Sequence, residues 1–218
     1  MRILLTGFNE FGGLEYNPSE VIVKELAERL KFSESYSLLV EVLPTEFYKA
    51  GMRIRELMET FKPDVVIGLG VAVDRHFIQL ERIALNLMDT VVPDNAGAIY
   101  AGTQIVPDGP LAYLATLPLD KMRARIQSLG LPVEISNHAG TYVCNNVFYL
   151  ARHETERLGL NIRCGFIHIP PFASENRTTN HHRLGLSPHQ IIKAIEACID
   201  VLQETTASEN RLRRNQSN

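Results

Sequence analysis

Two kinds of hydrophobic pattern alternate along the chain. Short apolar runs bounded by Gly, Pro or polar residues predict buried strands; they occur at 2–6, 37–43, 64–69, 133–136 and 163–169. Longer segments between them carry apolar residues at helical spacing; they predict helices over 18–30, 46–61, 119–129, 145–158 and 188–202. Alternation of this kind predicts one three-layer α/β/α sandwich built on a mostly parallel twisted sheet.

The middle of the chain is less regular than either end. Residues 77–87 are compatible with a strand that contains a bend, and residues 90–110 are rich in Pro, Asp and Gly. We therefore expect a long loop or short hairpin over 90–110, and a long loop inside a compact domain is often functional. Nothing divides the chain, so we expect a single catalytic domain over 1–203 and a frayed polar tail over 204–218.

The composition narrows the class of protein further. The 218 residues are 45% hydrophobic and 22% charged, with a net charge of -3 and no long block of either sign. Nucleic acid and an anionic membrane are therefore not expected partners. The apolar run at the N-terminus is too short for a signal peptide, and no run approaches the roughly 20 residues that span a bilayer. Three cysteines without a CxxC pair favour a reducing cytoplasm over a disulfide scaffold.

Cys144 is the residue with the clearest chemical context. It follows a predicted strand and the loop His138–Val143, and it stands directly before a predicted helix. Unpaired backbone N–H groups and the helix dipole at such a position favour a thiolate and can bind an oxyanion. Cys164 and Cys198 lie within a predicted strand and helix, as structural cysteines usually do. We therefore interpret Cys144 as a candidate nucleophile.

His168 is the candidate base for that nucleophile. It ends the predicted strand 163–169, just before Pro170 and Pro171. If strands 133–136 and 163–169 are parallel neighbours joined by a right-handed crossover, Cys144 and His168 lie above the same sheet edge, where α/β proteins bind ligands.

A third group is needed to orient the imidazole, and spacing alone does not identify it. Glu81 lies between apolar residues, but its position beside Arg82 favours a surface ion pair, and Asp74, Asp89 and Asp94 remain open as alternatives. Phe8 and Phe11 occupy a glycine-rich turn at the same predicted edge, where lining a pocket and packing under the loop are equally compatible with the pattern.

The remaining histidines do not predict a metal site. His181, His182 and His189 lie in a polar stretch without an i, i+4 pair and a nearby carboxylate. We therefore expect solvated loop residues there and no metal site.

Several motifs occur in order along residues 2–172: Leu-Leu-Thr-Gly-Phe-Asn-Glu-Phe-Gly-Gly (4–13), Asn-Pro-Ser (17–19), Pro-Thr (44–45), Phe-Tyr (47–48), Glu-Arg-Ile-Ala (81–84) with Asn86, Pro-Asp-Asn (93–95), Ala-Gly-Thr-Tyr-Val-Cys-Asn (139–145) and Gly-Phe-Ile-His-Ile-Pro (165–170). Together these motifs resemble those of type I pyroglutamyl peptidases, cysteine enzymes that remove an N-terminal 5-oxoproline.

The resemblance implies specific roles. It makes Cys144 the nucleophile, His168 the base and Glu81 the third member of the triad. It assigns the apolar slot for the oxoproline ring to four residues: Phe8, Phe11, Tyr142 and Val143. It further implies a homotetramer, no cofactor, and peptides with an N-terminal pyroglutamyl residue as substrates.

The chain departs from the family pattern at Glu10, where many members carry proline, at 71–74, where a Gly-Gly-Arg ending is missing, and at 171–186. These departures affect the rim of the leaving side of the site. Two other interpretations stay open on the residues alone: a different thiol hydrolase on the same scaffold, and a non-catalytic ligand-binding domain in which Cys144 is merely buried.

Overall fold

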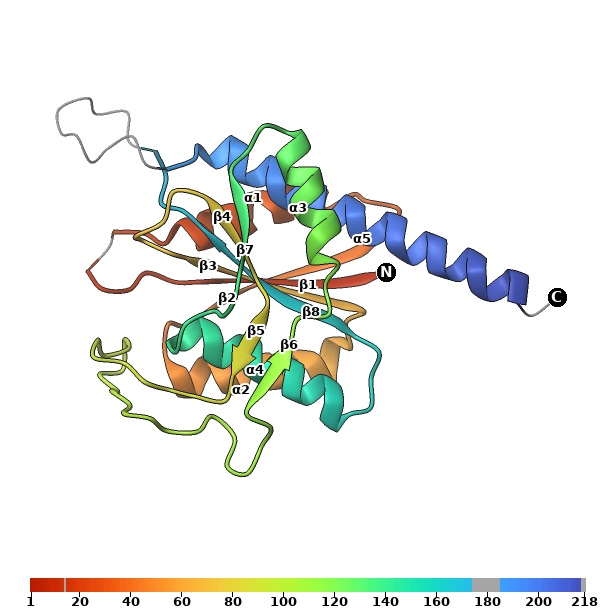
Figure 1. Ribbon diagram of the computed structural model, residues 1–218. Helices are drawn as coiled ribbons and strands as arrows, with labels where there is room; N and C mark the ends of the chain where they lie inside the picture. The colour runs from red at the N-terminus through yellow and green to blue at the C-terminus, as the bar shows by residue number, and fades with distance from the viewer. Residues whose placement is uncertain (14, 174–184, 217–218) are drawn as a thin grey trace.

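A central sheet organises the protein (Figure 1). The computed structural model describes residues 1–13, 15–173 and 185–216. Within them, a six-stranded sheet has the order β2 (Ser37–Leu43), β1 (Arg2–Phe8), β3 (Val65–Val71), β8 (Arg163–Ile169), β4 (Ile78–Glu81) and β7 (Val133–Ser136). The pairs β2–β1, β1–β3 and β3–β8 are parallel, so Phe8, Val71 and Ile169 end their strands at the same edge.

Helices cover both faces of the sheet. One face packs against α1 (Pro18–Leu30), α3 (Leu119–Ser128) and α5 (Pro188–Gln216), and the other against α2 (Phe47–Phe61) and α4 (Val143–Arg157). A separate hairpin of β5 (Ile83–Leu85) and β6 (Ala112–Leu114) packs beside α4. The predicted α/β class with a mostly parallel sheet is confirmed.

The predicted pairing of strands 133–136 and 163–169 is wrong. The strand β4 lies between β7 and β8, parallel to β7 and antiparallel to β8, so β7 and β8 run in opposite directions. The segment interpreted as one bent strand over 77–87 instead divides into β4 and β5, which belong to different sheets. Its pairing partners lie far away along the chain, and local sequence patterns do not reveal such partners. The insertion of β4 places Glu81 directly opposite Phe166 of β8.

The last helix is longer than predicted. It continues to Gln216 instead of ending near Leu202. The added turns are polar, but they are tied to the sheet, because Arg163 at the start of β8 donates a hydrogen bond to Thr206 at 2.8 Å and pairs with Glu209. Favourable helix formers and these contacts together extend the helix past the apolar stripe. Across the described ranges, none of the helices has the length and apolar character that a membrane crossing requires.

Candidate active site

Cys144 is the second residue of α4 and therefore lies in the first turn of that helix. The residue before the helix, Tyr142, provides no side-chain cap, and the first turn contains no acidic residue. The N–H groups of the first turn are therefore available, and the helix dipole favours negative charge at this point. The thiol is half-buried, whereas Cys164 and Cys198 are buried.

A glycine on β3 allows the thiol to approach the sheet. Gly70 lies opposite His168 in the β3–β8 register. A Cβ atom built on Gly70 would come within 2.7 Å of the Cys144 Sγ atom and 3.0 Å of the Phe166 ring. A contact of 2.7 Å is shorter than real Cβ contacts, so a side chain at residue 70 would displace the Cys144 thiol from this position.

His168 and Glu81 form a buried pair on neighbouring strands. His168 Nδ1 lies 2.8 Å from Glu81 Oε1, and both residues are buried. Because an ionised carboxylate only accepts, Nδ1 carries the proton in this bond. The second carboxylate oxygen, Oε2, is also buried and has no hydrogen-bond partner among the described residues. The bond to His168 is therefore the interaction that compensates burial of the Glu81 charge.

The surroundings of His168 raise its pKa. Burial alone acts to lower it, but hydrogen bonds to Cys144 and Glu81 and the negative charges of both raise it, with a net change from 6.5 to about 10. The imidazole is therefore held in its protonated form at neutral pH. A protonated histidine beside a thiolate can stabilise the anion and later deliver a proton.

Two consecutive asparagines after the cysteine fix the start of α4. The Asn145 side chain accepts a hydrogen bond from Leu85 N at 2.9 Å and donates to the carbonyl oxygens of Leu85 and Leu87. Asn146 donates to the carbonyl oxygen of Phe47 at 2.9 Å. Sequence analysis gave these residues no role, although two adjacent polar residues on the buried side of a helix are a signal of such clamps.

A cavity of about 230 Å³ opens beside Cys144 and His168. Phe8, Phe11 and Tyr142 line it, together with Asn17, Thr45, Ala139 and residues 71–74. Val143 is fully buried among core residues and does not line the cavity, so its side chain is not a wall of this space. The walls are mainly apolar, with Cys144 and His168 at one side.

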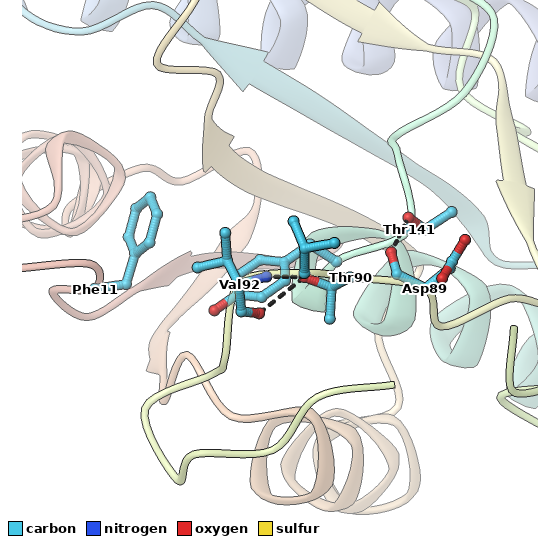
Figure 2. A pocket seen from close by; sticks show the side chains of 7 residues that line it. Phe11, Asp89, Thr90, Val92 and Thr141 are labelled. Carbon is cyan, nitrogen blue, oxygen red and sulfur yellow. Dashed lines mark hydrogen bonds between the residues drawn. The ribbon is translucent and has the colours of Figure 1, made fainter. Parts of the chain in front are cut away.

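A second, more open hollow of about 450 Å³ adjoins this cavity, sharing Phe11 and Tyr142 with it (Figure 2). Figure 2 shows Asp89, Thr90 and Val92 among the residues that line the hollow. The Thr141 hydroxyl donates a hydrogen bond to the carbonyl oxygen of Asp89 at 2.5 Å. The Tyr142 hydroxyl donates to the carbonyl oxygen of Pro93 at 3.0 Å. The loop after β5 is thereby tied to the residues that precede Cys144.

Among the described residues, His168 Nδ1 bonds to Glu81 and not to any of the three aspartates that the sequence left open. Asp74 lines the cavity wall, Asp89 lines the second hollow, and Asp94 accepts hydrogen bonds from the backbone of Phe47, Ala96 and Ala98.

His189 is exposed, whereas His181 and His182 lie outside the described residues. In the part of the chain that the structure describes, no group of three or more His, Cys, Asp or Glu residues has the arrangement of a metal site.

Comparison with known proteins identifies the relatives of this chain. The sequence profile of the pyroglutamyl peptidase family matches residues 1–205. The pyrrolidone-carboxylate peptidase of Thermoanaerobacter sp. (strain X514) is 38% identical over 202 residues, covering 93% of this chain and 98% of that protein. The enzyme of Pyrococcus furiosus is 41% identical over 170 residues, covering 78% of this chain and 81% of that protein.

The fold comparison agrees with the sequence comparison. A solved structure of a mutant pyrrolidone carboxyl peptidase from Pyrococcus furiosus superposes with a TM-score of 0.88 at 35% identity. The superposition covers 94% of this chain and 99% of that one.

We predict that native alkylation with iodoacetamide at neutral pH modifies Cys144 alone. Cys164 and Cys198 are buried, and burial raises the pKa of each thiol to about 12, so neither supplies thiolate. Peptide mass spectrometry after a short incubation gives the site. Equal modification of all three cysteines in the folded protein would contradict the assignment, and unfolding in urea beforehand provides the control in which all three react.

Proposed function

The chain belongs to the pyroglutamyl peptidase family, and on that premise we propose that it hydrolyses the bond after an N-terminal 5-oxoprolyl residue in peptides. In this proposal Cys144 is the nucleophile, His168 the general acid and base, and Glu81 the group that orients His168. The proposal rests on the arrangement of three groups: the Cys144 thiol at the start of a helix, the His168 imidazole beside the same cavity, and the buried Glu81 carboxylate bonded to that imidazole.

The proposed reaction proceeds by acyl transfer. The Cys144 thiolate attacks the carbonyl carbon of the oxoprolyl residue, and backbone N–H groups at the start of α4 bind the resulting oxyanion. His168 gives its proton to the leaving amine as the C–N bond breaks and a thioester forms. The now neutral His168 then takes a proton from water, which attacks the thioester and releases 5-oxoproline and the thiolate.

The cavity suits a neutral lactam ring. A 5-oxoprolyl residue carries no ammonium group, and its flat ring can lie against Phe8, Phe11 and Tyr142, the aromatic residues of the wall. An N-terminal glutaminyl residue would place an ammonium group against these apolar walls, and burying it unpaired would cost on the order of several kcal/mol. The proposed specificity therefore follows from exclusion of charge as much as from contact with the ring.

We also propose that the protein is a homo-oligomer, a tetramer as the family resemblance implies. Large apolar side chains are exposed on α2, at Tyr48 and Met52, and along the following loops, at Val91, Ile99 and Leu111. Exposed apolar groups of this number favour association when they lie on a shared surface.

The three free thiols, one of them proposed as nucleophile, further support a reducing compartment such as the cytoplasm as the place of action.

Replacing the nucleophile should abolish turnover. We expect Cys144→Ala to reduce release of a fluorogenic amine from a pyroglutamyl amide by at least about a thousandfold, because the covalent step is lost. Cys198→Ala removes the same group from a buried position and serves as the matched control, for which we expect activity close to that of the parent. Prolyl and glutaminyl amides test ring specificity. Near-normal turnover by Cys144→Ala would contradict the mechanism.

Replacing the orienting carboxylate should shift the pH profile. In Glu81→Gln a charge that raises the pKa of His168 is missing, so we expect the alkaline limb of kcat to move to lower pH. An exposed carboxylate on β7, Glu134, provides the control substitution Glu134→Gln, which should leave the profile in place. An unchanged alkaline limb in Glu81→Gln would contradict the role of Glu81.

The same pair links stability to pH. The pKa of His168 in the folded protein lies above its value in the unfolded chain. Its protonated form therefore contributes fully to the free energy of unfolding below about pH 6.5, and this contribution is lost as the pH rises through about 10. The stability difference between the parent and Glu81→Gln should therefore shrink across that window.

The oligomer is tested by sedimentation velocity at micromolar concentration. We expect a species of four times the chain mass of 24.5 kDa. A single monomeric species over the whole concentration range would contradict the proposal without affecting the assignment of the site.

A further inference from the structure

Asp74 places a carboxylate on the wall of the cavity that contains Cys144 and His168. It lies in the turn that follows β3, which is closed by a hydrogen bond from Arg75 N to the carbonyl oxygen of Ala72 at 3.1 Å. Its side chain is 72% exposed, so the carboxylate is at the mouth of the cavity and not in its interior. The mechanism above gives this residue no role.

The turn that carries Asp74 lies on the side of His168. The backbone N–H of Ala72 donates to the carbonyl oxygen of Ile169 at 3.0 Å, which ties the turn to the residue after His168. In the proposed reaction His168 must reach the nitrogen of the leaving amine, so the leaving residue departs past this side of the cavity. The side chain that follows the oxoproline is therefore directed toward the mouth at Asp74.

The charge at this mouth is negative. Of the described residues that line the cavity, Asp74 is the one carboxylate, and no lysine or arginine is among them. Arg75 is the nearest cation to Asp74, with 3.6 Å between its Nε atom and the Asp74 Oδ2 atom, and its side chain is 49% exposed. That separation is too long for a hydrogen bond. Arg75 therefore neutralises the charge of the Asp74 carboxylate only in part, and the carboxylate can accept a hydrogen bond from another group.

We propose that Asp74 is a specificity-determining residue that favours peptides with lysine or arginine directly after the 5-oxoproline. The inference rests on the proposed function and adds the substrate class to it. A cationic side chain leaving past His168 would pair with the carboxylate at the mouth, and an acidic one would be repelled. Because the pair is exposed to water, we expect a preference of about two- to fivefold.

The test compares three substrates that differ in the second residue: the amides of pyroglutamyl-lysine, pyroglutamyl-glutamine and pyroglutamyl-glutamate. For the parent enzyme we expect kcat/KM to fall in that order, with the lysine-to-glutamine ratio decreasing as salt is added, since added ions screen exposed charges. In Asp74→Asn the ratio should fall to about one. In Arg75→Gln it should rise, because the competing cation is removed.

Asp89→Asn is the matched control, since it makes the same charge change in the adjoining hollow, which Cys144 and His168 do not line. It should retain the parent lysine-to-glutamine ratio. An equal loss of the ratio in both variants would overturn the inference, because it would reflect the overall field and not a contact at Asp74.

A parent ratio of one or less, with all three substrates cleaved, would overturn the role of Asp74 and leave the proposed function intact. No cleavage of any of the three would overturn the proposed function, and this inference with it.

Discussion

The packing of the start of α4 against bare backbone at Gly70 is the constraint on which the site depends. The thiol of Cys144 occupies the space that a side chain at residue 70 would fill. The same strand is paired with β8, so the thiol that rests on β3 lies beside His168. Close packing of a helix end on a strand thus fixes Cys144 and His168 at one sheet edge. The Asn145 and Asn146 side chains hold that helix end by bonds to β5 and α2.

The Glu81–His168 pair depends in turn on an antiparallel strand within a mostly parallel sheet. The strand β4 brings a carboxylate into a region where Glu81 is 1% exposed. Such a carboxylate is tolerated because His168 is held protonated beside it. The Glu81 carboxylate and the His168 imidazolium therefore depend on each other for their burial.

Local signals predicted the start of α4 near Cys144 and the end of β8 near His168, because each boundary depends on a few neighbouring residues. Glu81 pairs with His168, which lies 87 residues further along the chain. No local pattern shows this pairing, so only the resemblance to the family identified Glu81. For the same reason the β5–β6 hairpin, the turns of α5 beyond Leu202 and the Asn145 clamp were missed. Each is stabilised by contacts with distant parts of the chain, which no local pattern records.

Direct detection of the acyl-enzyme tests most sharply whether Cys144 forms a thioester with the oxoprolyl group. The enzyme would be mixed with a pyroglutamyl amide, quenched in acid within the first turnovers, digested and analysed by mass spectrometry. We expect an oxoprolyl adduct on the peptide that contains Cys144, and neutral hydroxylamine should remove it as it removes a thioester. Turnover of the substrate with no adduct on Cys144, or with the adduct on another residue, would contradict it.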